Sequence, residues 1–174
     1  MHPCHHAKTS PDKPAYIMAG SGETVTFRQL DERSNQIAHA FRNAGLKPGD
    51  TIALFAENSP RYFEICWAAQ RSGLYFVCIS SRLTAPEVQY IVEDSGSSLL
   101  IASKSKADVA TKVKEITQLH HYWSIGGDIP GYQPLESHQQ TFPVTPIADE
   151  MSGTDMLYSS GTTGRPKGIR PALE

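Results

Sequence analysis

The chain of 174 residues carries 16 lysines and arginines against 18 aspartates and glutamates, a formal net charge of −2. Hydrophobic residues make up 39% and charged residues 20%, a balance typical of globular proteins that excludes a disordered or low-complexity chain. Because the near-neutral charge offers no broad basic surface, we expect no nucleic-acid partner.

No segment of the sequence has the length of a transmembrane helix. The longest apolar run, Leu74 to Ile79, falls far short of the roughly 20 residues that a spanning helix needs. The N-terminus lacks the apolar core of a signal peptide. Three cysteines without a CxxC spacing suit a reducing compartment, so we expect a cytoplasmic protein.

Residues 24–125 alternate apolar runs with helical patterns. Thr26 and Gln29 stand at capping-box spacing, and the apolar residues that follow recur at helical spacing up to Gly45. Proline and glycine at the centre of residues 47–50 predict a type II turn. The continuous apolar run 51–56 predicts a strand that is buried on both faces.

Three more helices and three more strands are expected in this region. Ser59-Pro60 and Thr84 with Glu87 mark helix starts, and a weaker helix is expected over 107–118 with Val109, Val113 and Ile116 facing inward. Further strands are expected at 74–79, 98–102 and 121–125. We expect Cys66 to pack in the core and Cys78 to lie in a buried run. This alternation predicts an α/β fold, a largely parallel sheet flanked by helices.

The rest of the chain divides into three further parts. We expect residues 1–23 to be a loosely held N-terminal segment, whose histidines and Cys4 form no specific metal site. Residues 126–153 contain four prolines and no sustained hydrophobic periodicity, which predicts an extended connector. Residues 154–174 hold a short strand at 155–158 and a glycine-rich loop.

That loop has the composition of a phosphate cradle. Gly161 and Gly164 permit positive φ and a close approach of a polyanion to the backbone, and successive N–H groups of such a turn can point at phosphate oxygens. Lys167 supplies a positive charge. Hydroxyl groups add further donors, from Ser159, Ser160, Thr162 and Thr163.

Two other interpretations of this loop compete with a phosphate cradle. A P-loop NTPase needs a helix that starts at Gly-Lys-Ser/Thr, but here Pro166 precedes Lys167, and Gly168 and Pro171 follow it. A stretch rich in Gly, Ser, Thr and Pro is more often an ordinary surface loop than a binding site. However, Ser-Gly-Thr-Thr-Gly-x-Pro-Lys fixes seven positions, and a chance match is on the order of 10⁻⁸ per start.

Residues 158–168 resemble the signature loop of the AMP-forming acyl-CoA synthetases and their adenylating relatives. Upstream blocks of the sequence resemble the same family in the same order, namely residues 26–30, 45–50, 57–60 and 82–87. Within the family, residues 157–160 and 168–171 look most like bacterial fatty-acid-CoA ligases. The resemblance therefore implies the incomplete N-terminal part of an adenylating domain.

The family resemblance implies a two-step reaction that uses ATP, Mg²⁺ and CoA. A carboxylate, here a fatty acid, attacks the α-phosphorus of ATP to give acyl-AMP and pyrophosphate, and the CoA thiol then displaces AMP. Preplaced donors stabilise the charge that moves to the leaving pyrophosphate. By this analogy the residues that contact the ATP phosphates are Ser159, Ser160, Gly161, Thr162, Thr163, Gly164 and Lys167.

The family's adenine, acyl and CoA sites and its catalytic lysine are expected beyond Glu174. We therefore expect no catalytic residue in these 174 residues and little turnover by them alone. A non-catalytic remnant that at most binds a nucleotide or a partner chain is the alternative. Because apolar surface and an unpaired sheet edge are exposed, we expect the isolated chain to be marginally stable or to self-associate.

Overall fold

The computed structural model describes residues 2–159 and 164–173. Its helical elements are α1 (Pro3–Thr9), α2 (Phe27–Asn43), α3 (Pro60–Arg71), α4 (Ala85–Asp94), the short 3₁₀ turn η1 (Lys104–Lys106), α5 (Ala107–Ile116) and α6 (Leu135–Gln139). Its strands are β1 (Pro14–Ile17), β2 (Thr24–Thr26), β3 (Thr51–Phe55), β4 (Tyr75–Ile79), β5 (Ser97–Ser103), β6 (His121–Ile125), β7 (Gln133–Pro134), β8 (Thr154–Asp155), β9 (Leu157–Ser159) and β10 (Lys167–Ile169). Among the helices described, none is both long and apolar enough to span a bilayer.

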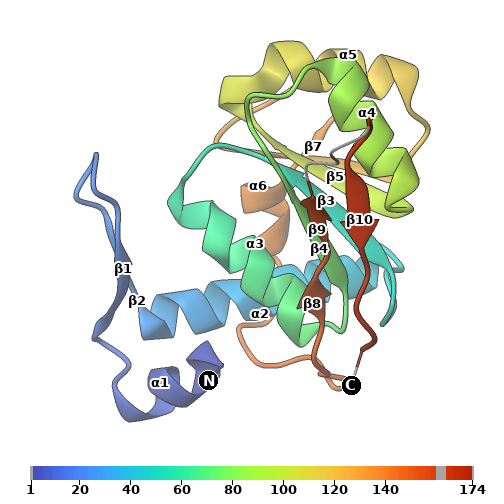
Figure 1. Cartoon of the computed structure of the whole chain (residues 1–174). Coiled ribbons are helices and arrows are strands. Elements are labelled where there is room, and N and C mark those ends of the chain that lie inside the picture. The colour runs from blue at the N-terminus through green and yellow to red at the C-terminus, as the bar shows by residue number, and fades with distance from the viewer. Residues whose placement is uncertain (1, 160–163, 174) are drawn as a thin grey trace.

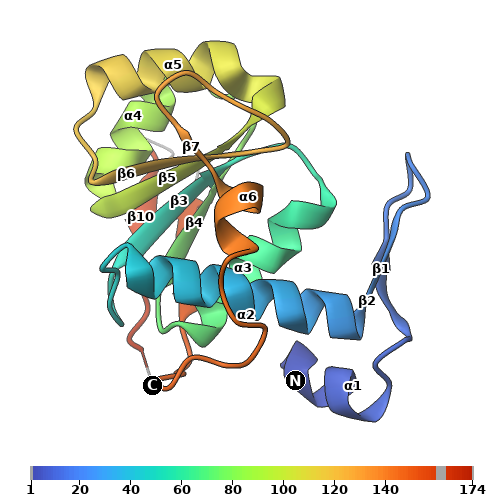
Figure 2. The ribbon, with the colours of Figure 1, turned by 180° about the vertical axis from the view of Figure 1, so that it is seen from behind.

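Six strands form one parallel sheet in the order β7-β6-β5-β3-β4-β8. The central strand β3 pairs with β4 on one side and β5 on the other, and all its residues are buried. Helices α2, α3 and α6 cover one face of the sheet, and α4 and α5 cover the other (Figures 1 and 2). The predicted α/β fold, a largely parallel sheet flanked by helices, is confirmed.

Alternate residues of β3 supply both halves of the core. Leu54 packs in a cluster with Phe41 of α2 and Ile65 of α3, and the next residue, Phe55, packs on the opposite face with Val88 of α4. Because neighbouring strand residues point to opposite faces, a continuous apolar run is what a strand covered on both sides requires.

Both predicted capping boxes are present. At the start of α2 the Gln29 N–H donates to Thr26 Oγ1 at 3.3 Å, and the Thr26 N–H donates to Gln29 Oε1 at 3.0 Å. At the start of α4 the Thr84 N–H donates to Glu87 Oε2 at 2.8 Å. Gly49 has a φ of 91°, as the predicted type II turn requires.

The N-terminal segment is more ordered than the sequence led us to expect. Residues 3–9 form α1, which lies beside α2, and β1 pairs with β2 in a separate antiparallel ribbon (Figure 1). His2 is the N-cap of α1, and its Nδ1 accepts a hydrogen bond from the Cys4 N–H at 3.2 Å. Since histidine is not among the preferred N-cap residues, the usual start signal was missing.

Three side chains differ from their expected environments. Cys78 is exposed rather than buried: its side chain points towards Cys66 of α3, to the sheet face opposite its buried neighbours Val77 and Ile79, and α3 covers it only in part. Ile116, in the last turn of α5, is 42% exposed rather than inward. Ser59 is the N-cap of α3 as predicted, but its hydroxyl makes no capping hydrogen bond.

The predicted strand at 155–158 consists of two strands. β8 belongs to the main sheet, whereas β9 pairs with β10. Met156 between them is buried in the core.

The proline-rich connector crosses the molecule from one edge of the sheet to the other, because β7 and β8 are the two edge strands. It is not extended throughout. Leu135 is buried and anchors the five-residue helix α6, which is too short to give a helical period in the sequence.

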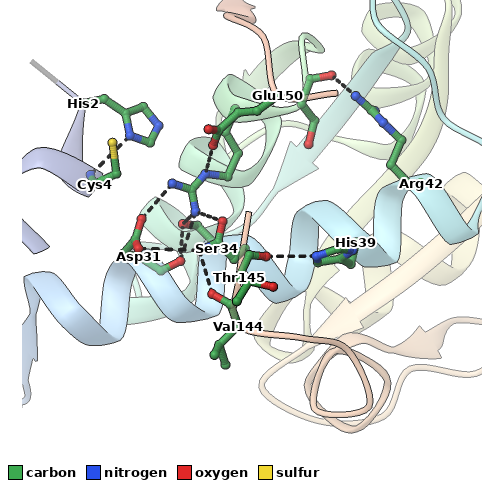
Figure 3. Close-up of polar contacts among 12 residues, drawn as sticks. His2, Cys4, Asp31, Ser34, His39, Arg42, Val144, Thr145 and Glu150 are labelled. Carbon is green, nitrogen blue, oxygen red and sulfur yellow. Dashed lines mark hydrogen bonds and ion pairs between the residues drawn. The ribbon is translucent and has the colours of Figure 1, made fainter. Parts of the chain in front are cut away.

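The segment after α6 is bound along α2 by polar side chains (Figure 3). Three of them, spaced four and three residues apart, bond to it: Asn35 donates to the Val144 carbonyl at 2.7 Å, His39 bonds the Thr145 carbonyl at 2.9 Å, and Arg42 donates to the Asp149 carboxylate at 2.9 Å. Side chains at this spacing share one helix face, so α2 carries a polar stripe that fixes the path of the connector.

Arg71 of α3 completes this anchor. Its side chain is fully buried, Nη2 lies 2.7 Å from Asp31 Oδ1, and Nε lies 2.9 Å from Glu150 Oε1. Nη1 donates to Ser34 Oγ at 3.2 Å. Figure 3 shows Asp31 and Ser34 of α2 and Glu150 of the connector gathered at this point. One guanidinium thus joins α3, α2 and the segment that leads into β8.

Candidate phosphate-binding site

The glycine-rich loop connects the two strands of an antiparallel ribbon. In its register Ser159 of β9 stands opposite Lys167 of β10, at the mouth of the loop. Directly paired residues of an antiparallel ribbon point to the same side, with Cβ atoms about 5 Å apart. Both residues are exposed, so a hydroxyl and an ammonium group are presented together at this position.

Three of the seven predicted site residues fall within the described structure, and the ribbon brings Ser159 and Lys167 together. The third, Gly164, has a φ of 142°, a conformation that L side chains rarely adopt, as expected of this glycine. The other four lie outside the described residues: Ser160, Gly161, Thr162 and Thr163.

The ribbon geometry excludes the P-loop interpretation. A P-loop lysine opens a helix whose N-terminal N–H groups face the phosphates. Lys167 instead begins strand β10, and no described residue after it is helical. The exclusion made from Pro166 and Gly168 in the sequence is therefore confirmed.

Helix α4 holds the inner face of the ribbon. The Tyr158 hydroxyl donates to Asp94 Oδ2 at 2.7 Å, and the Tyr90 hydroxyl donates to the Pro166 carbonyl at 2.9 Å. Burial, and secondly the Asp94 carboxylate, raise the pKa of Tyr158, so its hydroxyl stays protonated and keeps donating. The Arg165 guanidinium lies over the Tyr90 ring, 5.1 Å from its centroid. Both arms of the loop are thus tied to one helix.

Gly168 stands opposite Tyr158 in the ribbon and makes room for its ring. A Cβ at Gly168 would lie 2.5 Å from Met156 Cε and 2.9 Å from Tyr158 Cζ. These distances are shorter than real Cβ contacts, so a methyl group here would displace the end of Met156 and press on the Tyr158 ring.

The chain after β10 is fastened to β4. The Tyr75 hydroxyl donates to the Pro171 carbonyl at 2.6 Å, and the Arg170 guanidinium lies 4.1 Å from the centroid of the Tyr75 ring. Arg170 also donates to the Gly49 carbonyl at 2.7 Å. The ribbon is therefore anchored at its open end as well as along its inner face.

The two sides of the ribbon differ in charge. A cleft of about 670 Å³ lies between α4 and the returning arm of the loop, but Glu87 and Glu93 line it, and its cation Arg165 is stacked on Tyr90. A polyphosphate is repelled by those carboxylates. The outer side presents Lys167 and Ser159, which makes it the better place for phosphates.

The described residues do not show where a magnesium ion would bind. No group of three or more histidine, cysteine, aspartate or glutamate side chains gathers among them. Mg²⁺ therefore stays a prediction from the family resemblance.

Sequence reasoning missed Tyr90 and Asp94 as residues that position the loop. They stand four residues apart on α4, beside the predicted apolar stripe, so the sequence does predict that they share one face of the helix. Their partners are 76 and 64 residues away, and nothing in the local pattern identifies them.

Sequence comparison relates almost the whole chain to one family. Residues 4–170 match the AMP-binding enzyme family. The fatty acid–[acyl-carrier-protein] ligase ScoC of Streptomyces coeruleorubidus is 37% identical over 164 residues, which cover 94% of this chain and 31% of that protein. The long-chain-fatty-acid–CoA ligase FadD13 of Mycobacterium tuberculosis is 31% identical over 166 residues, covering 94% and 32%. The chain thus spans about a third of the length of these curated relatives.

Solved structures agree with this assignment. The anthranilate CoA ligase AuaEII, in complex with anthranoyl-AMP, matches with a TM-score of 0.85 and 26% identity over 96% of this chain and 33% of that one. The inhibitor-bound N-terminal domain of FACL13 from Mycobacterium tuberculosis matches with a TM-score of 0.84 and 28% identity over 96% and 42%. On the sequence match, the sheet topology and the glycine-rich ribbon together, this chain belongs to the AMP-binding enzyme family.

Proposed function

We propose that this chain is the phosphate-binding part of an ATP-dependent, AMP-forming acyl-CoA ligase that acts on a fatty acid. The observation that carries the proposal is the glycine-rich ribbon, which pairs Ser159 with Lys167 at the mouth of a Ser-Gly-Thr-Thr-Gly-x-Pro-Lys loop. In the first step a carboxylate oxygen attacks the α-phosphorus of ATP, and the bond from that phosphorus to pyrophosphate breaks. In the second step a thiol attacks the acyl carbon and AMP leaves.

In this proposal the ribbon binds the triphosphate and stabilises the leaving pyrophosphate. Lys167 supplies positive charge where negative charge increases during the reaction, and we expect the loop hydroxyl and N–H groups to add hydrogen-bond donors. The remaining predicted contacts, at residues 160–164, belong to the same cradle. Mg²⁺, when bound with ATP, would screen the phosphates further.

The fatty acid and the thiol are the finer parts of the proposal. The relatives named above include one whose name specifies an acyl-carrier protein and one whose name specifies CoA. We propose CoA for this protein. Comparing thioester formation with CoA and with a phosphopantetheine-bearing carrier protein distinguishes the two acceptors.

Nucleotide binding tests the ribbon directly. ATP titrated into the chain should bind, and Lys167→Ala should weaken it roughly tenfold or more, because a charged hydrogen bond to phosphate is lost. Lys112→Ala, which removes an exposed lysine of α5, is the matched control and should leave the affinity unchanged. Equal affinity of the Lys167→Ala variant and the unaltered chain would contradict the assignment.

Pyrophosphate release, measured on a protein that also carries the segments expected beyond Glu174, separates the ligase from its alternatives. Release that requires both ATP and a fatty acid supports the proposed reaction. ATP binding without release supports a non-catalytic remnant that binds nucleotide, and phosphate release without any acid would indicate a nucleoside triphosphatase.

A further inference from the structure

Two cysteines from different elements face each other at the open end of β4. Cys66 lies on α3 and Cys78 on β4, and their sulfur atoms are 3.9 Å apart. Cys66 is half-buried, Cys78 is exposed, and both are free thiols. The third cysteine, Cys4, lies on α1 near the N-terminus. The family reaction proposed above uses none of them.

The two thiols have different acid strengths. The hydrogen bond from the Cys66 thiol, together with one from Tyr62, lowers the pKa of Cys78 to about 7, against the opposing effects of burial and of Asp155 on β8. The hydrogen bond to Cys78 and burial raise the pKa of Cys66. Near neutral pH about half of Cys78 is therefore thiolate, whereas Cys66 stays protonated.

This pairing has the features of a reactive thiol with a resolving partner. The thiolate is the nucleophilic form of cysteine, and oxidation follows thiolate character and exposure. A cavity of about 490 Å³ opens beside Cys78, between the ends of β3 and β4, and gives a small oxidant access to the sulfur. Cys66 is close enough to react next, since forming a bond of about 2 Å requires the sulfur atoms to approach by only about 2 Å.

We propose that Cys66 and Cys78 form a dithiol that hydroperoxides oxidise to an intramolecular disulfide. The Cys78 thiolate attacks the outer peroxide oxygen, the O–O bond breaks, and an alkoxide or hydroxide leaves, so that Cys78 becomes a sulfenic acid. The Cys66 sulfur then attacks the Cys78 sulfur and the S–O bond breaks. The thiol proton and the departing hydroxide form water. In sum, two thiols and one hydroperoxide give one disulfide, one alcohol or water, and one further water.

Hydrogen peroxide on the full chain tests the proposal. With an equimolar dose at pH 7, peptide mapping by mass spectrometry should find Cys66 linked to Cys78, with the loss of two hydrogen atoms and full reversal by dithiothreitol. This measurement needs no variant, so it does not depend on how a substituted chain folds. If both cysteines stay reduced, or the linkage forms between two chains, the proposal is overturned.

Three single substitutions assign the roles. Cys66→Ser should stop at a sulfenic acid on Cys78, trapped by dimedone, because no resolving thiol is present. Cys78→Ser should oxidise at least tenfold more slowly, since it removes the exposed thiol whose pKa is lowered. Cys4→Ser is the control and should oxidise as the unaltered chain does. Sulfenic acid on Cys66 in the unaltered chain, or equally fast oxidation of the Cys78→Ser variant, would contradict these roles.

Discussion

Replacing Arg71 by methionine removes a buried guanidinium but keeps an unbranched side chain, so the change tests charge more than volume. Two carboxylates then lose their partner, Asp31 of α2 at 2.7 Å and Glu150 of the connector at 2.9 Å. The hydroxyl of Ser34 loses its hydrogen bond as well. We expect the connector to detach from α2 and α3 and the whole chain to become less stable.

The size of the effect follows from burial. Removing one partner of a buried ion pair costs roughly 3–5 kcal/mol. The Arg71 side chain is 0% exposed, but Asp31 and Glu150 are 22% and 38% exposed, so water can partly rehydrate both carboxylates. This places the loss of unfolding free energy near the lower end of that range, at about 3 kcal/mol. For a chain of this length that corresponds to a fall in melting temperature of about 6–12 °C.

Thermal unfolding followed by circular dichroism at pH 7 measures this loss. Arg28→Met is the matched control, because Arg28 also lies on a helix and pairs with Asp12 at 3.3 Å, but with side chains 52% and 83% exposed. Such a surface pair contributes about 1 kcal/mol or less. An Arg71→Met variant that melts no lower than the Arg28→Met variant would refute the reasoning from burial.

Three further changes test other parts of the structure. Gly168→Ala places a methyl group against the Tyr158 ring and should weaken ATP binding several-fold in a titration, whereas Gly20→Ala, which meets nothing within 4 Å, should not. Burial, and secondly a neighbouring guanidinium, lower the pKa of His2 from 6.5 to about 4. Between pH 4 and pH 6.5 the unfolded chain therefore binds more protons than the folded chain. The contribution of His2 to stability should be complete above pH 6.5 and decrease towards pH 4. His2→Gln should therefore reduce the dependence of the melting temperature on pH in this range. Leu157→Lys should reduce self-association in sedimentation experiments, because this side chain is 60% exposed on the outer face of the ribbon. A strictly monomeric unaltered chain would contradict that prediction.

The parts of the fold that could be predicted are those decided by neighbours in the sequence. The capping boxes at Thr26 and Thr84 join residues three positions apart, so their bonds are visible in the pattern itself. The apolar run of β3 is likewise local, and its burial on both faces followed from its composition. Short elements such as α6 were missed because five residues cannot establish a period.

What could not be predicted depends on contacts between distant residues. The connector has its path because Asn35 binds the Val144 carbonyl, a pair 109 positions apart. Cys78 is exposed although Val77 and Ile79 beside it are buried, so the apolar run 74–79 alone did not show which of its side chains would be left uncovered. Periodicity identifies which residues tend to be buried, but it does not identify what covers them.

The candidate site divides in the same way. Composition and spacing identified the residues that point outward to a ligand, but not those that set the direction in which they point. In an antiparallel ribbon, paired residues share a face and neighbouring residues alternate, so the register that places Lys167 opposite Ser159 also turns Tyr158 and Gly168 inward. A slip of one residue would put Tyr158 and Lys167 on the same face, so that either Tyr158 would turn outward, away from Asp94, or Lys167 would turn against α4. The presentation of the lysine therefore depends on an aromatic ring that fits over a glycine on the opposite face, and the inner contacts are as necessary to the proposed chemistry as the loop itself.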